Sequence, residues 1–130
     1  MIGFVAGTFD LLHAGHVHLL KQCRMQCDTL IVGLHVDPSI ERKEKHKPIE
    51  SILEREIRLK GCKYVDQIVV YETEADLSLI FKYLKIDIRF LGSDYIQDKP
   101  VTDPNAIRIA YIDSLPITSS NLRERIKKTE

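Results

Sequence analysis

Residues 7–16 read Gly-Thr-Phe-Asp-Leu-Leu-His-Ala-Gly-His, and the fold and the predicted site both follow from this stretch. It comes after a short apolar run, Phe4-Val5-Ala6, that is typical of a buried strand. An apolar helical pattern follows it. Gly7 allows a tight turn, and Gly15 allows another group to approach the backbone closely. The stretch therefore joins a strand to the start of a helix, where unpaired amides favour an anion.

The rest of the chain alternates strand and helix patterns. Further buried strands are predicted at 30–34, 67–71, 88–91 and 107–112, and helices at 16–27, 51–61, 77–84 and from 119 onward. Ser51 and Glu54 form a capping box, and we expect Leu53 and Ile57 to make the buried face of that helix. The order predicts one α/β domain over 1–130, a Rossmann-like doubly wound parallel sheet of about five strands. Such folds bind ligands at the carboxyl ends of their strands.

Composition excludes several classes of protein. Lys+Arg and Asp+Glu both number 19, a balance that argues against binding to duplex nucleic acid. We find no apolar run long enough to span a membrane and no secretory leader. The odd number of cysteines, three, is typical of reduced thiols packed in the core of a cytoplasmic protein.

Two histidines frame the start of the predicted helix. His13 and His16 can donate hydrogen bonds to phosphate oxygens and stabilise developing charge there. His16 also lies on the apolar helix face, so a core role is the alternative. Zinc ligation together with His18 is disfavoured, because residues two apart on a helix diverge. The stretch matches neither a P-loop nor Gly-x-Gly-x-x-Gly.

A basic loop, residues 42–47, follows the second strand. It holds Lys43, Lys45 and Lys47, and its place after a strand favours phosphate binding over the alternative of a solvated charged face.

The ten-residue stretch resembles the signature of the cytidylyltransferase family, especially the glycerol-3-phosphate cytidylyltransferases, within the wider His-x-Gly-His nucleotidyltransferase superfamily. The resemblance implies that residues 7–10 and Gly15 bind the nucleotide: Gly7, Thr8, Phe9 and Asp10 in the loop, and Gly15 at the helix start. It also implies that His13 and His16 contact the triphosphate and stabilise the transition state.

The same resemblance assigns roles to later residues. Lys43 is then a catalytic lysine, and Lys45 and Arg55 bind the nucleotide, although Arg55 has the alternative of pairing with Glu54 or Glu56 on the surface. Residues 92–95 resemble the family's Gly-Asp-Asp-Trp segment, which implies nucleotide binding by Gly92 and Asp94; a loop cap is the alternative for Asp94. Residues 117–120 resemble Ile-Ser-Thr-Thr, which implies phosphate binding by Thr118, Ser119 and Ser120, and plain helix capping is the overlapping alternative.

Two positions depart from the family pattern. Asp113 aligns with a phosphate-binding arginine, and Arg123 or Arg125 on the last helix is the candidate replacement. Ser93 stands where the family has an aspartate.

The resemblance implies transfer of CMP from CTP to a small phosphorylated alcohol such as glycerol 3-phosphate, with release of pyrophosphate. It further implies Mg²⁺ with the nucleotide, to which Asp10 or Asp94 is a candidate ligand, and a homodimer. One alternative is a sugar-phosphate adenylyltransferase that uses ATP, because Lys47-Pro48-Ile49 followed by a helix resembles that group. The other is a nucleotide-binding module without turnover, which Asp113 favours.

Overall fold

A computed structural model describes residues 1–92, 107–113 and 115–129. In these residues the strands are β1 (Ile2–Gly7), β2 (Thr29–His35), β3 (Gln67–Tyr71), β4 (Ile88–Gly92) and β5 (Arg108–Ile112). The helices are α1 (Ala14–Arg24), α2 (Ile52–Lys60), α3 (Glu74–Tyr83) and α4 (Ser119–Lys128). This is the predicted order of strands and helices.

All strands pair in parallel, in the order β3-β2-β1-β4-β5. One core cluster packs α1 and α2 against the sheet through Leu20, Cys23 and Leu59. A second cluster packs α3 against the opposite face through Leu77 and Phe81. Both faces of the sheet are therefore covered, and the predicted Rossmann-like doubly wound fold is confirmed.

The strand order reverses at β1, which lies between β2 and β4. Chain segments leave β1 and β4 in opposite directions along the sheet, and this opens a crevice at their carboxyl ends. Gly7, His35 and Gly92 end three neighbouring strands at this edge. The fold therefore places Gly7, His35 and Gly92 at the edge of the sheet where such folds bind ligands.

Helix α2 begins as predicted but buries a different face. The capping box is present, with Glu54 N donating to Ser51 Oγ at 3.2 Å and Ser51 N donating to Glu54 Oε1 at 3.0 Å. Leu53 and Ile57, however, are 63% and 61% exposed, whereas Leu59 is fully buried. The prediction was wrong because Ile52 and Leu59 share the other face, together with a buried arginine that a hydrophobic pattern does not include.

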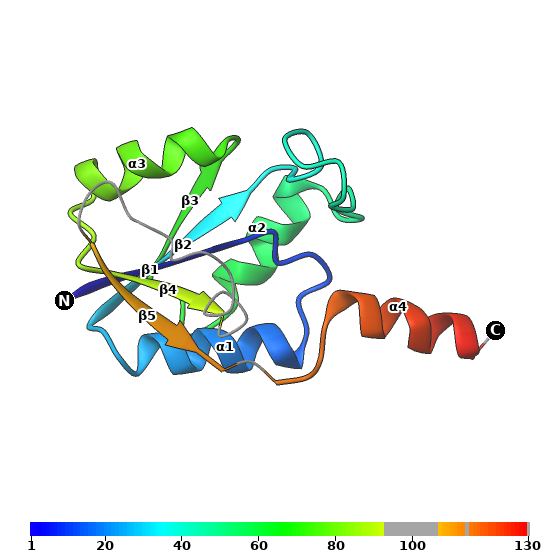
Figure 1. The fold of residues 1–130 in the computed structure, drawn as a ribbon. Coiled ribbons are helices and arrows are strands. Elements are labelled where there is room, and N and C mark those ends of the chain that lie inside the picture. The colour runs from blue at the N-terminus through cyan, green and yellow to red at the C-terminus, as the bar shows by residue number, and fades with distance from the viewer. Residues whose placement is uncertain (93–106, 114, 130) are drawn as a thin grey trace.

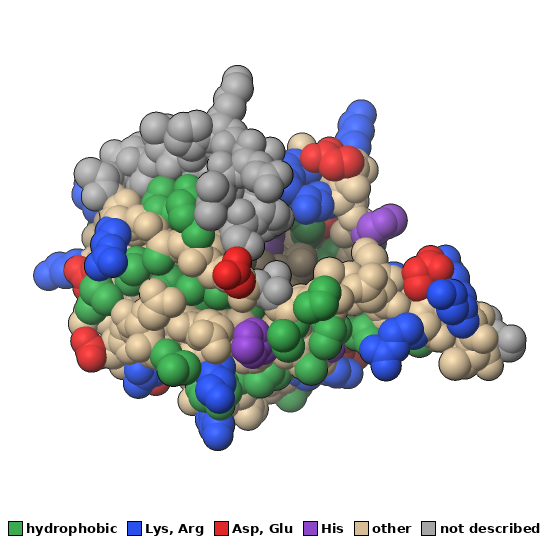
Figure 2. Space-filling model, turned by 60° about the horizontal axis from the view of Figure 1, so that its bottom comes forward, with side chains coloured by type: hydrophobic (Ala, Val, Ile, Leu, Met, Phe, Trp, Pro, Cys, Tyr) green, Lys and Arg blue, Asp and Glu red, His purple; other side chains and the backbone are tan. Residues whose placement is uncertain are grey.

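The last helix, α4, extends away from the sheet (Figure 1). None of its residues is buried, and Ile126, an apolar residue of this helix, is 57% exposed. Figure 2 shows basic and acidic side chains interspersed on one face of the molecule, in keeping with the balanced composition. Within the described part of the chain, no helix has the length and apolar character needed to cross a bilayer.

The face that α2 buries can be tested by truncating one leucine on each side. Leu59→Ala should lower the free energy of unfolding by about 2–5 kcal/mol, because it leaves a cavity in the core. Leu53→Ala, the matched control, should change it by less than about 0.5 kcal/mol. Urea denaturation of both variants measures this, and a larger loss for Leu53→Ala would contradict the packing described here.

Candidate functional site

His13 and His16 form a stacked pair at the start of α1. Their ring centroids lie 3.9 Å apart with an interplanar angle of 25°. His13 is the N-cap residue, and its Nδ1 accepts from Gly15 N at 3.1 Å. The Nδ1 of His16 accepts from His13 N at 3.3 Å. Because Nδ1 accepts in both rings, a neutral imidazole at either position carries its proton on Nε2. Each ring is therefore prepared to donate one hydrogen bond from Nε2.

Burial keeps both rings neutral at pH 7. Desolvation, with a smaller contribution from neighbouring His13, lowers the pKa of His16 to about 4. Desolvation also lowers the pKa of His13. The Nε2 of His13 is buried, and no described residue accepts its proton. A buried donor without a partner is unfavourable by about 1–3 kcal/mol, so the site lacks an acceptor that a ligand oxygen can provide.

The loop before the histidines has a strained backbone. Phe9 and Leu11 have φ values of 49° and 53°, in the left-handed region that residues with a Cβ seldom adopt. Asp10 between them is buried, and its carboxylate accepts from Ile49 N and Glu50 N, both at 2.9 Å. These hydrogen bonds hold the loop against the segment that leads into α2 and offset the strain.

The amino ends of α1 and α4 meet at this loop. Ser119 Oγ donates to the carbonyl oxygen of Asp10 at 3.0 Å, and Arg123 Nη2 lies 3.2 Å from Asp10 Oδ2. A Cβ on Gly15 would lie 2.6 Å from the carbonyl oxygen of Ile117, so only glycine fits this contact. Two helix amino ends, each with unpaired amides, thus point at one region and favour an anion there.

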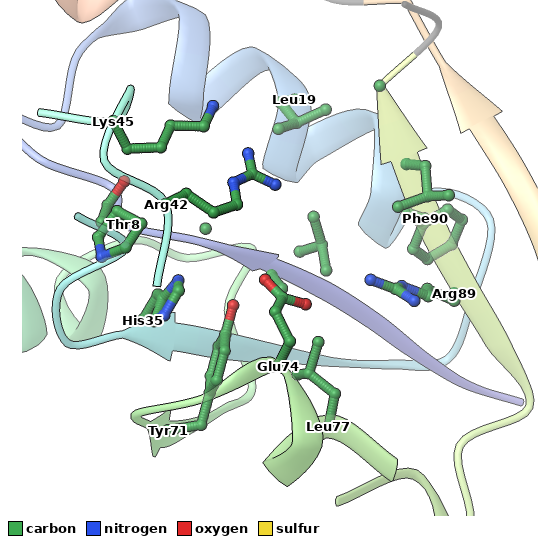
Figure 3. Close-up of a pocket in the computed structure, with 16 residues that line it drawn as sticks. Thr8, Leu19, His35, Arg42, Lys45, Tyr71, Glu74, Leu77, Arg89 and Phe90 are labelled. Atoms are coloured by element: carbon green, nitrogen blue, oxygen red, sulfur yellow. The ribbon is translucent and has the colours of Figure 1, made fainter. Parts of the chain in front are cut away.

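Two cavities adjoin the loop. The first, of about 380 Å³, lies at the carboxyl ends of β1, β2 and β4, and Figure 3 shows Arg42, Lys45 and Arg89 directed into it. The second, of about 360 Å³, is lined by polar residues from the loop, the basic segment and the start of α4. Thr8, Pro38 and Lys45 line both cavities. A molecule in one cavity is therefore separated from a molecule in the other by little more than these side chains.

The structure gathers about half of the predicted residues at these cavities, and both histidines are among those that it does not. Of the predicted residues, the first cavity includes Gly7, Thr8, Lys45 and Gly92, and the second includes Thr8, Asp10, Lys45, Ser119 and Ser120. The described residues that line neither are Phe9, His13, Gly15, His16, Lys43, Lys47, Arg55 and Thr118. Asp94 and Ser93 lie outside the described residues. Phe9 contacts the His16 ring, with centroids 5.4 Å apart, and Thr118 is the N-cap of α4.

Arg55 lies beneath the site and is not on the surface. It is 2% exposed, and its guanidinium donates to the carbonyl oxygens of Glu50, Thr8, His35 and Val36 at 2.6–3.2 Å. The alternative of a surface pair with Glu54 or Glu56 was therefore wrong. Arg55 ties the ends of β1 and β2 to the start of α2, and so it fixes the backbone that lines both cavities.

Several residues of the first cavity were missed by the sequence analysis: His35, Arg42, Tyr71, Glu74 and Arg89. One of them had a usable signal. Arg89 is a charged residue inside a strand whose neighbours are apolar, and such a residue is seldom buried without a reason. The others end a strand, begin a helix or lie in the basic loop, and these positions carry no distinctive pattern.

Removing the guanidinium of Arg55 should destabilise the fold. Arg55→Met leaves four carbonyl oxygens without their donor, and we expect a loss of about 3 kcal/mol or more in the free energy of unfolding. Lys60→Met, which removes only an exposed i,i+4 pair with Glu56, is the control and should cost about 0.5 kcal/mol. Equal losses in chemical denaturation would contradict the structural role of Arg55.

The buried state of His16 predicts a pH dependence of stability. Its folded pKa, about 4, lies below the value of about 6.5 expected in the unfolded chain, so the unfolded state takes up the proton first as pH falls. The wild type should lose roughly 3 kcal/mol more than His16→Gln between pH 7 and pH 4. Replacing the exposed His46 by Gln is the control and should leave the wild-type slope unchanged. NMR titration of His16 near pH 6.5 would refute this.

Comparison with known proteins identifies the family. The model of cytidylyltransferase-like proteins matches residues 4–113. Bifunctional protein HldE of Acidiphilium cryptum (strain JF-5) is 42% identical over 101 residues, which are 77% of this chain and 21% of that protein. Its counterpart from Campylobacter jejuni (strain RM1221) is 37% identical over 129 residues, 97% of this chain and 28% of that protein. The chain thus spans about a quarter of the length of these relatives.

A solved structure has the same fold. The crystal structure of the lipopolysaccharide core biosynthesis protein from Thermoplasma volcanium GSS1 superposes with a TM-score of 0.71 at 25% identity, covering 88% of this chain and 98% of that one. Together with the matched family model and the stacked histidines at the start of α1, this shows that the chain belongs to the cytidylyltransferase-like family of nucleotidyltransferases.

Proposed function

We propose that the chain transfers a nucleoside monophosphate from a nucleoside triphosphate to a phosphorylated sugar and releases pyrophosphate. One observation carries the proposal: two stacked neutral imidazoles, whose Nδ1 atoms accept from the backbone, lie at the amino end of α1 directly after the loop whose Thr8 lines both cavities. Such donors stabilise charge that develops on a phosphoryl group.

The two cavities suit two substrates. The second cavity combines the amino end of α4 with Lys45, His46 and Arg123, a set that favours the triphosphate. The first cavity, with Arg42, Lys45 and Arg89, is suited to a phosphorylated acceptor. Thr8 and Lys45 line both, so we assign the transferred phosphoryl group to the space between them.

The reaction proposed is a direct in-line displacement. An oxygen of the acceptor phosphate attacks the α-phosphorus, a new P–O bond forms, and the bond to the β-phosphate bridging oxygen breaks. The electron pair of that bond leaves with pyrophosphate. His13 and His16 donate hydrogen bonds to the α-phosphoryl oxygens, and Lys45 offsets the repulsion between the two anionic substrates. No side chain forms a covalent intermediate.

Asp113 stands where the family has a phosphate-binding arginine, and Arg123 is the better of the two candidates to replace that arginine. Asp113 is exposed and lines neither cavity, whereas Arg123 lies in the second cavity against Asp10. Arg125 is exposed and lines neither cavity. A cation from α4 in the second cavity weakens the reason that Asp113 gave for a module that only binds nucleotide.

Magnesium fits this arrangement as an ion that arrives with the triphosphate. Both carboxylate oxygens of Asp10 already accept hydrogen bonds, and the described residues contain no cluster of three or more metal-binding side chains. Mg²⁺ commonly binds through phosphate oxygens and water with few protein ligands. When bound, it would supply charge neutralisation at the phosphates.

We favour a sugar phosphate and ATP over glycerol 3-phosphate and CTP. Relatives that are 36–43% identical to this chain are named bifunctional protein HldE, and the similar solved structure is titled a lipopolysaccharide core biosynthesis protein. Lys47-Pro48-Ile49 before α2 resembles the sugar-phosphate adenylyltransferases. CMP transfer to glycerol 3-phosphate is the competing candidate, which the ten-residue signature supports.

The experiment is a matrix of ATP and CTP against hexose and heptose 1-phosphates and glycerol 3-phosphate, followed by pyrophosphate release and product mass. We expect turnover with ATP and a sugar phosphate. Turnover only with CTP and glycerol 3-phosphate would replace the proposal by its competitor. Nucleotide binding without pyrophosphate release from any pair would reduce the chain to a binding module.

Two substitutions test the residues assigned to the chemistry. His16→Ala should cost about 2–4 kcal/mol of transition-state stabilisation while the fold persists. Lys45→Met should lower kcat/KM about 100-fold, whereas Lys43→Met, on the same loop but in neither cavity, should change it less than about threefold. A larger effect at Lys43 would return the catalytic lysine to the position predicted from sequence.

A further inference from the structure

Arg89 of the first cavity pairs with no carboxylate in the described part of the chain. Arg89 lies on β4 and points to the α3 side of the sheet, where its guanidinium carbon is 5.4 Å from the centroid of the Phe81 ring. Its Nε is buried without an acceptor, and no hydrogen bond or ion pair joins Arg89 to another described residue. A guanidinium stays protonated, and a buried Nε donor without an acceptor is unfavourable. The structure therefore holds a donor for a ligand that carries oxygen atoms.

An acceptor lies across the same space. Glu74, the first residue of α3, directs its carboxylate into the cavity (Figure 3), and it forms no ion pair with Arg89 in the described chain. Its backbone is fixed, because Glu74 N donates to Glu41 Oε1 at 3.0 Å. A guanidinium and a carboxylate separated by open space complement hydroxyl groups, since a hydroxyl both accepts and donates. Tyr71 and Leu77 line the same wall and offer apolar surface to ring carbons.

The separation of the Arg89 and Thr8 backbones along the sheet bears on the length of the ligand. Arg89 is the register partner of Phe4, and Thr8 lies four residues further along β1 and its extension, roughly 13 Å at about 3.3 Å per residue. An acceptor whose phosphate lies at Thr8 must extend back along the sheet to reach Arg89 and Glu74. A sugar ring with exocyclic hydroxyls spans more of this distance than a three-carbon chain does.

We infer that Arg89 and Glu74 form a hydroxyl-recognition subsite that selects a sugar-sized acceptor over glycerol 3-phosphate. The inference rests on the proposed function, because it takes the first cavity as the acceptor site. Arg89 and Glu74 act in binding and not in the chemical step. Their loss should therefore raise the acceptor KM far more than it lowers kcat.

The test measures binding and turnover separately. Calorimetry with hexose and heptose 1-phosphates and with glycerol 3-phosphate, without nucleotide, compares the wild type with Arg89→Met, Glu74→Gln and the control Arg108→Met, an exposed arginine of β5. For the preferred sugar phosphate, we expect Kd and KM to rise at least tenfold in the first two variants. The affinity for ATP should stay within twofold, glycerol 3-phosphate within threefold, and Arg108→Met should match the wild type.

Sugar-phosphate affinity within threefold of the wild type in both cavity variants would overturn the inference, as would a wild type that binds no sugar phosphate. Should Arg89→Met fail to fold, the result for Glu74→Gln at the exposed start of α3 decides the question alone.

The experiment also distinguishes failure of the proposed function from failure of the proposed subsite. Binding that depends on Arg89 without pyrophosphate release refutes the proposed function only, and turnover on sugar phosphates that is indifferent to Arg89 and Glu74 refutes the subsite only.

Discussion

The site depends on an imidazole that caps its own helix. A serine or aspartate at the N-cap would satisfy an amide of α1 equally well, but it would leave no second donor. His13 accepts from Gly15 N with one ring nitrogen and keeps the other for a ligand, and His13 N in turn orients the ring of His16. Backbone hydrogen bonds thus set the tautomer of both rings, and because burial lowers the pKa of His16 to about 4, that ring is neutral at pH 7 and can donate from Nε2.

The strength of this arrangement comes from buried polar contacts around it. Asp10 joins the loop to the entry of α2 and to α4, while Arg55 joins the ends of β1 and β2 to α2. These contacts act between segments that are far apart in the sequence. They hold two left-handed residues in place and keep the two cavities adjoining at Thr8.

The sequence was sufficient for the topology because strand and helix patterns alternate clearly and each glycine-ended strand marks the same edge of the sheet. The sequence did not predict which face of α2 is buried. Leu53 and Ile57 have the spacing of a core face but are exposed, and the buried face carries Arg55. The sequence also could not choose among the lysines of the basic loop. Nothing periodic distinguishes Lys43 from Lys45, and only the path of the backbone brings Lys45 to both cavities.

The contact between Gly15 and the carbonyl of Ile117 has a consequence for how the protein matures. The signature is synthesised about a hundred residues before the segment that packs on it. On the ribosome, β1, β2 and β3 can pair while the second wall of the site is still untranslated. The site therefore cannot be complete until the segment around Ile117 has been made, and truncation ahead of Ile117 would leave the start of α1 without the backbone that packs on it.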